Sequence, residues 1–96
     1  MNQDLLERRG LILHACHAQY PGRLMFAAIE RHVMPFYVNE GGQFTRDLEY
    51  LKDSAFLSEE TAEVAGRSYT SYKITPAGIN LVEGTRTDPG ISFKRF

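Results

Sequence analysis

The chain has 96 residues, of which 43% are hydrophobic and 24% are charged, and its formal net charge is −1. This length supports one domain with a modest core and excludes two, and a homodimer would add to its stability. The composition is that of a soluble globular protein and excludes a disordered or fibrous chain. The small net charge gives no global attraction to phosphate, so a nucleic-acid partner would need a local cationic surface.

Cysteine content and hydropathy bear on the compartment. The lone Cys16 excludes an internal disulfide. The N-terminal residues lack the basic and apolar regions of a signal peptide, and no segment is apolar enough to span a bilayer. We therefore expect a protein of the reducing cytoplasm that has no membrane partner.

Apolar residues at helical spacing predict the first two helices. The first helix has such a face in Leu5, Leu6, Ile12, Leu13 and Cys16. It is expected to end near Tyr20-Pro21-Gly22, because Pro21 disfavours a helical Tyr20. The second helix is expected to begin just after this turn and to stop at Pro35. Its apolar stripe is formed by Met25, Phe26, Ile29 and Val33.

A third amphipathic helix follows the flexible connection Glu40-Gly41-Gly42. Its inward face is predicted to carry Phe44, Leu48 and Leu51, which lie at i, i+4 and i+7. Its outward face is predicted to present Gln43, Arg46, Glu49 and Asp53. The helix is expected to end at Ser54-Ala55, after which Phe56-Leu57 re-enters the core.

The next segment has the pattern of a two-stranded wing. Ala62 and Val64 alternate along one strand, Tyr72 and Ile74 alternate along the next, and both sets are expected to face the core. A two-residue turn at Gly66-Arg67 would put the sets on opposite faces. We therefore favour a three-residue loop, Gly66-Arg67-Ser68, which leaves Arg67 at the wing tip and Tyr69 on the outer side.

A short C-terminal helix completes the pattern. Thr75 is its expected N-cap, Pro76 its first residue and Gly84 its end, with Ile79 and Val82 on its apolar side. This order of elements predicts an α+β fold, a winged helix-turn-helix with three helices, a two-stranded wing, a short C-terminal helix and a tail. Residues 1–84 are assigned to the winged-helix domain and residues 85–96 to the tail.

The motifs resemble those of small winged-helix-like proteins of Mu-like phages and prophages. The resemblance covers nearly the whole chain and rests on Arg9 before Ile12-Leu13, on Asp47-Leu48-Glu49-Tyr50-Leu51, and on Ile74-Thr75-Pro76-Ala77-Gly78 followed by Gly84 and Pro89-Gly90-Ile91. Ala55 departs from it where such proteins usually have a helix-ending glycine, and Gly41-Gly42 loosens the segment before the third helix. The resemblance implies a phage protein in the host-cell cytoplasm, encoded near head-morphogenesis and packaging genes.

Several polar residues bear on pairing, metal binding or catalysis. Arg9 interrupts the apolar face of the first helix, and we expect its guanidinium to pair with Asp47 or Glu83; a contact at a dimer seam is the alternative. His14 and Cys16 diverge on a helix, so no metal site is expected. No phosphate-binding loop or nucleophile motif is present in the sequence, so we expect no enzyme and no cofactor.

Two functions remain open. In the first, the protein is a DNA-binding accessory or regulator whose third helix enters the major groove of double-stranded DNA. The residues able to contact bases or phosphate are then Gln43, Thr45, Arg46, Tyr50, Arg67, Arg86, Lys94 and Arg95. Charge argues against strong binding, because residues 43–75 sum to −2 whereas the tail sums to +2.

In the second, the chain is an interaction module that docks another phage protein in morphogenesis or packaging and does not bind DNA. Its contacts would be the acidic outer face, exposed Leu11 and Tyr69, and the tail from residue 91 to residue 96.

Overall fold

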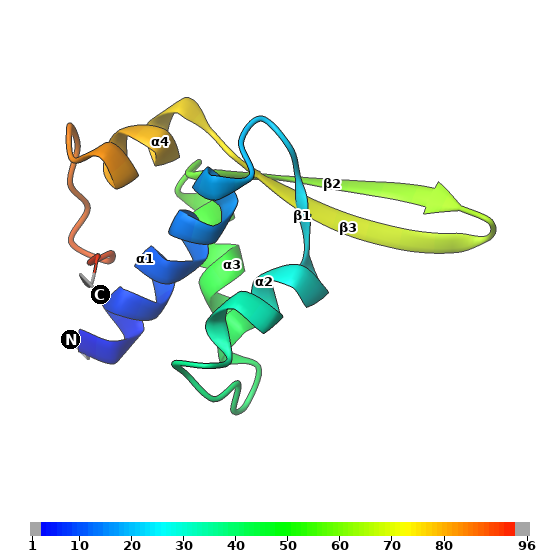
Figure 1. Cartoon of the computed structure of the whole chain (residues 1–96), viewed down its shortest axis with the longest axis horizontal. Coiled ribbons are helices and arrows are strands. Elements are labelled where there is room, and N and C mark those ends of the chain that lie inside the picture. The colour runs from blue at the N-terminus through cyan, green and yellow to red at the C-terminus, as the bar shows by residue number, and fades with distance from the viewer. Residues whose placement is uncertain (1–2, 94–96) are drawn as a thin grey trace.

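The computed structural model describes residues 3–93, which form four helices and a three-stranded antiparallel sheet (Figure 1). The helices are α1 (Gln3–Ala18), α2 (Phe26–Val33), α3 (Gln43–Asp53) and α4 (Pro76–Glu83). The strands are β1 (Leu24–Met25), β2 (Leu57–Val64) and β3 (Arg67–Ile74), in the sheet order β1-β3-β2. The predicted winged helix-turn-helix is confirmed, with α2 and α3 as the helix pair and β2–β3 as the wing.

α1 is the central helix, because it contacts α2, α3, α4 and β3. Its buried apolar residues consequently lie on several sides of the helix rather than on one stripe. Leu11 is only 8% exposed and belongs to the core, so the expectation that it forms an exposed contact is wrong. Within residues 3–93, none of the helices is both long and apolar enough to cross a membrane.

The start of α2 is set by β1, a strand that periodicity does not predict. Leu24 and Met25 pair with Tyr72 and Ser71 of β3, so the helix begins only at Phe26. Met25, which was assigned to the buried stripe, is instead the N-cap and is 43% exposed. The strand has two residues, which is too short to show alternation.

α3 has its predicted inward face and its predicted end. Phe44, Leu48 and Leu51 are buried. At the C-terminus, the backbone N–H of Ala55 donates to Lys52 and that of Phe56 donates to Leu51, which is a Schellman motif. Ala55 therefore takes the left-handed φ of 63°, a conformation that favours glycine.

The wing turn differs from the prediction. Val64 pairs with Arg67, so the connection is the two-residue turn Ala65-Gly66, with φ values of 53° and 77°. Positive φ at both positions is what a type I′ hairpin turn requires. The favoured three-residue loop is therefore wrong, although Arg67 still lies beside the tip.

The expected facing of the wing residues is also wrong. Leu57 pairs with Ile74 and Glu59 with Tyr72, so Ala62 and Val64 lie on the face opposite to the two buried β3 residues. Val64 is 60% exposed. The outer half of the hairpin projects beyond the helices (Figure 1), where neither face has a core to cover. Alternation there does not determine the register.

α4 begins and ends as predicted. The Thr75 side chain accepts a hydrogen bond from the Gly78 N–H at 3.1 Å, and Pro76 is the first helical residue. Gly84 has a left-handed φ of 84° and ends the helix. The described part of the tail then folds back, because Ile91 is buried and the Ser92 N–H donates to the Leu6 carbonyl at 3.0 Å.

Burial makes the single thiol unreactive. Cys16 is 1% exposed, and burial raises the pKa of its thiol from 9.0 to about 12. A raised pKa means that the protonated thiol favours the folded state below pH 9 and that this contribution is lost as the pH rises toward 12.

At pH 8 we expect the native protein to be alkylated by iodoacetamide at least about a thousandfold more slowly than the unfolded chain. The reason is the lower thiolate fraction that follows from the shift in pKa from 9.0 to about 12. Mass spectrometry of timed samples with and without urea measures both rates. Similar rates in the two samples would show that the thiol is accessible in the folded protein.

Candidate nucleic-acid interface

The outward side of α3 presents two of the predicted DNA contacts. Thr45 and Arg46 are both exposed. Within residues 3–93, the Arg46 guanidinium has no hydrogen bond or ion pair to another side chain. These residues lie in the first half of α3, the part of a recognition helix that approaches base edges in helix-turn-helix proteins.

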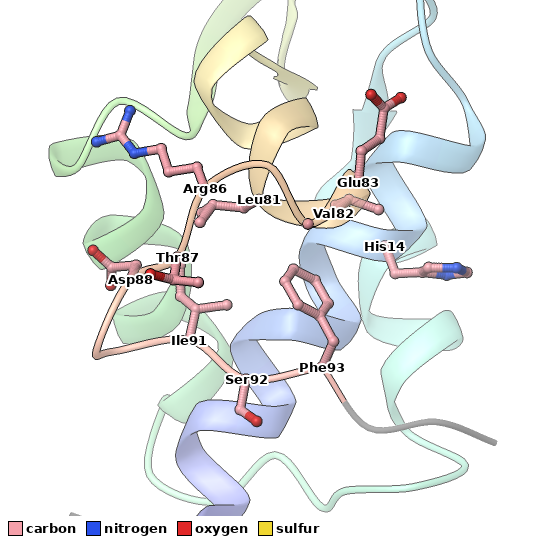
Figure 2. Close-up of a pocket in the computed structure, with 11 residues that line it drawn as sticks. His14, Leu81, Val82, Glu83, Arg86, Thr87, Asp88, Ile91, Ser92 and Phe93 are labelled. Atoms are coloured by element: carbon pink, nitrogen blue, oxygen red, sulfur yellow. The ribbon is translucent and has the colours of Figure 1, made fainter.

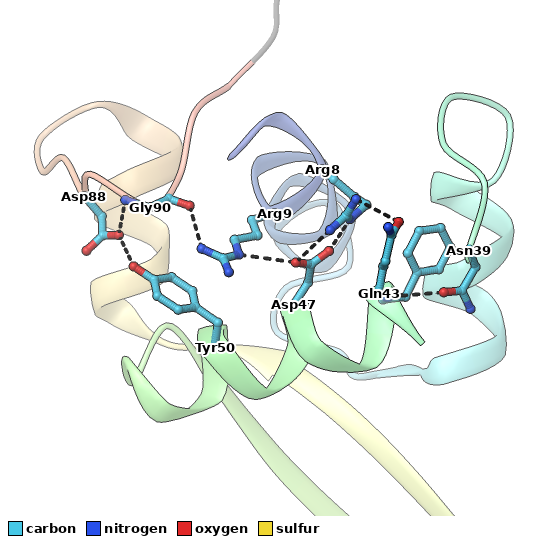
Figure 3. Close-up of polar contacts among 9 residues, drawn as sticks. Arg8, Arg9, Asn39, Gln43, Asp47, Tyr50, Asp88 and Gly90 are labelled. Carbon is cyan, nitrogen blue, oxygen red and sulfur yellow. Dashed lines mark hydrogen bonds and ion pairs between the residues drawn. The ribbon is translucent and has the colours of Figure 1, made fainter. Parts of the chain in front are cut away.

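Two other predicted contacts, Gln43 and Tyr50, are turned into the protein (Figure 3). Arg8 Nη1 donates to Gln43 Oε1 at 3.1 Å, and Tyr50 Oη donates to Asp88 Oδ2 at 2.6 Å. The hydrogen bond to Asp88 is the main cause that raises the pKa of Tyr50, followed by burial. The partners lie 35 and 38 positions away in sequence, beyond the reach of any local pattern.

Asp47 is the centre of a buried ion cluster between α1 and α3. The residue is 0% exposed, and Arg8 is 7% exposed. Arg8 donates to the carboxylate through Nε and through Nη2, the latter at 3.3 Å, and Arg9 Nε donates at 3.2 Å. The predicted pairing of Arg9 with Asp47 is confirmed. The second arginine was not predicted, because Arg8 was not distinguished from other surface charges on the helix.

This pairing changes the charge of the surface around α3 and the wing. Four of the six carboxylates in residues 43–75 have cationic partners. Three of these cations, Arg8, Arg9 and Arg23, come from outside the segment, so a charge sum over residues 43–75 omits them. The sequence count treated every carboxylate as free, which overstated the repulsion of phosphate.

Lys52 pairs with one carboxylate of α3 and one of the wing. Its Nζ lies 3.1 Å from Glu49 and 3.7 Å from Glu59. The hydrogen bond to Glu49 raises the pKa of the Lys52 ammonium group, so this charge is retained at physiological pH. Asp53 and Glu63 lack an ion-pair partner among residues 3–93.

The β2–β3 register divides the wing charges between two faces. Arg67 and Lys73 lie on one face together with Glu60, whereas Glu59 and Glu63 lie on the other. On the first face, Arg23 Nη1 lies 3.5 Å from Glu60, so that carboxylate is compensated. The face that carries Arg67 and Lys73 is therefore cationic.

The structure describes one of the three predicted contacts in the tail, Arg86. Arg86 is exposed, and its guanidinium lies 5.1 Å from the centroid of the Phe56 ring. Lys94 and Arg95 lie outside the described residues.

A groove lies between α1, α4 and the segment that follows α4. Its apolar wall includes Leu81, Val82 and Ile91. Figure 2 shows the Phe93 ring turned into the groove, while the side chains of His14 and Arg86 point away from it in different directions. These polar groups do not converge on one point, as a specific ligand or reacting atom would require. Across residues 3–93, no three His, Cys, Asp or Glu side chains are grouped as metal ligands would be.

Solved structures with a similar fold include several regulators. Matches are found with a protein of Streptococcus mutans (15% identity, 83% of this chain and 76% of that chain, TM-score 0.67) and with a transcriptional regulator from Clostridium thermocellum (18%, 88% and 84%, 0.66). Bacillus subtilis PadR in complex with operator DNA matches at 17% identity over 90% of this chain and 52% of that chain, with a TM-score of 0.61. The sequence matches no protein-family model and no curated protein. At these identities the similarity establishes the winged-helix fold alone.

We expect Asp47→Ala to lower the free energy of unfolding by about 3–5 kcal/mol, because it leaves two largely buried arginines without their carboxylate. Urea denaturation followed by circular dichroism measures the change. Asp53→Ala, on the exposed side of the same helix, is the matched control and is expected to change stability by less than about 0.5 kcal/mol. Equal effects of the two substitutions would show that the ion cluster does not stabilise the fold.

Proposed function

We propose that this protein is a non-enzymatic DNA-binding regulator or accessory protein that contacts double-stranded DNA through α3 and the wing. The observation that carries the proposal is Arg46 on the outward side of α3, which is exposed and makes no hydrogen bond or ion pair to another side chain of residues 3–93. Thr45 beside it supplies a hydroxyl donor for a phosphate, and Arg67 supplies a second guanidinium near the wing tip.

Electrostatics supports this interface more strongly than the sequence composition suggests. Asp47 is buried between two arginines, and Glu49 is paired with Lys52, so two of the carboxylates on α3 are compensated. The wing adds a cationic face through Arg67 and Lys73. The similarity to PadR, which was solved with operator DNA, supports the proposal by analogy of fold.

The biological setting of the proposal is a Mu-like phage or prophage in the host-cell cytoplasm. Its support is the resemblance carried by Arg9, the motif from Asp47 to Leu51 and the motif from Ile74 to Gly78.

A protein-docking module that binds no DNA is the second candidate function. Its specific support is an exposed apolar segment between α2 and α3, in which Met34, Phe36 and Val38 are 56%, 52% and 70% exposed. Two contacts first expected for this function are buried, namely Leu11 and Ile91.

Fluorescence anisotropy of a labelled mixed-sequence duplex tests DNA binding. We expect binding that weakens between about 50 mM and about 200 mM salt, because phosphate contacts release counterions. The double variant Arg46→Gln, Arg67→Gln should reduce the slope of log affinity against log salt by about two, one for each lost phosphate contact. Arg46→Glu, Arg67→Glu should abolish binding.

Arg31→Gln provides a matched control, because Arg31 is an exposed arginine of α2 outside the proposed contacts. It should retain the wild-type slope. Absence of binding at the lower salt concentration would refute the proposal and favour the protein-docking function. Binding with an unchanged slope in the Arg46→Gln, Arg67→Gln variant would place the contacts elsewhere on the molecule.

A further inference from the structure

α3 is tied to the segment that follows α4 through Tyr50 (Figure 3). The Tyr50 hydroxyl donates to Asp88 Oδ2 at 2.6 Å, and the same oxygen accepts the Gly90 N–H at 2.9 Å. Arg9 of α1 donates through Nη1 to the Gly90 carbonyl at 3.2 Å. Residues 88–92, which we call the strap, therefore connect the recognition helix to the central helix.

The strap is fixed closely against both helices. Ile91 is 9% exposed and joins the core, and Ser92 is hydrogen-bonded to the Leu6 carbonyl. A Cβ atom at Gly90 would lie 2.2 Å from Tyr50 Oη, which is closer than real Cβ contacts. The Tyr50 ring is also covered by the Arg9 guanidinium, 3.8 Å from the ring centroid. Arg9 of α1 and the strap thus clamp the Tyr50 side chain.

This clamp lies close to the proposed DNA contact, Arg46, along α3. Tyr50 is four residues after Arg46, so the two side chains lie about one helical turn apart on neighbouring positions of α3. Fixing Tyr50 restrains rotation of α3 about its axis, and that rotation determines which side chains face a groove. Asp47 provides the other anchor, toward Arg8 and Arg9.

We propose that Tyr50 and Asp88 are a positioning pair that holds α3 in its DNA-binding orientation and does not itself contact DNA. The proposal rests on the DNA-binding function proposed above. It assigns a role to the strap, which sequence analysis placed in a separate tail, and it replaces the predicted DNA contact by Tyr50 with an internal one.

The direction in which Asp88→Ala changes the affinity for DNA distinguishes a positioning role from a purely electrostatic one. Asp88 is an anion, so its removal should strengthen binding to DNA if only charge matters. If Asp88 positions α3, Asp88→Ala should weaken binding because Tyr50 loses its acceptor. Asp88→Asn also removes the charge but keeps an oxygen that can accept from Tyr50 and Gly90. It should therefore bind DNA at least as well as the wild type.

The experiment measures the affinity of the full chain for the duplex across a salt series. Asp88→Ala and Tyr50→Phe should each weaken binding roughly three- to tenfold, the range for loss of one hydrogen bond, with the wild-type salt slope. The double variant should be no weaker than Asp88→Ala, because Asp88→Ala already removes the hydrogen bond that Tyr50→Phe breaks. Equal or tighter binding by Asp88→Ala would overturn the inference and leave the proposed function intact. A Tyr50→Phe slope reduced by about one would show a phosphate contact and would also overturn it.

Hydrogen exchange of the DNA-free protein gives a second readout that does not depend on binding. The α3 amides should exchange faster in Asp88→Ala than in Asp88→Asn, because only the former loses the clamp. Unchanged exchange in Asp88→Ala overturns the inference whatever the DNA affinity. If the wild-type protein binds no duplex, the proposed function is refuted. The DNA-positioning role is then refuted as well, even if hydrogen exchange shows that Tyr50 and Asp88 restrain α3.

Discussion

The pose of α3 depends on one interaction, the buried contact of Asp47 with two arginines of α1. Three N–H groups of Arg8 and Arg9 converge on this carboxylate. A rotation or slide of α3 that removed one of them would leave a buried charge poorly compensated, which costs several kcal/mol. Arg8 also donates to Gln43 and Arg9 to the Gly90 carbonyl, so the same cluster also holds the first turn of α3 and the segment after α4.

This arrangement explains why the charge of a segment was a poor guide to its surface. A count along residues 43–75 includes Asp47, which is fully buried, and omits the arginines that neutralise it from α1. Arg23 acts similarly on Glu60 from the β1 junction. The charge count argued against DNA binding because it summed charges along the sequence. In the folded protein, ion pairs compensate much of that negative charge.

The sequence predicted the elements whose signals are local. The third helix has strong 3.6-residue periodicity in Phe44, Leu48 and Leu51, and α4 has an N-cap, an N-terminal proline and a C-terminal glycine, so both were predicted correctly. β1 has only two residues and no periodicity, and it is defined by pairing with β3. The burial of α1 on several sides likewise depends on the elements that surround it, which is why the burial of Leu11 was not predicted.

The candidate site shows the same division between local and distant signals. Amphipathicity placed Thr45 and Arg46 on the exposed side of α3, and the structure retains them there. The internal roles of Gln43 and Tyr50 could not be predicted, since each depends on a partner more than 30 residues away.

The β2–β3 register, which the sequence did not predict, determines the charge on each face of the wing. With the two-residue turn, Arg67 and Lys73 share one face, and Glu59 and Glu63 share the other. A shift of one residue in either strand would mix these charges and would leave no cationic face. The turn residues Ala65 and Gly66, which contact no core, therefore set the electrostatic character of the wing through their positive φ angles. A polyanion can approach this hairpin favourably from only one side, so the turn constrains the wing in the proposed DNA-binding function as Asp47 constrains α3.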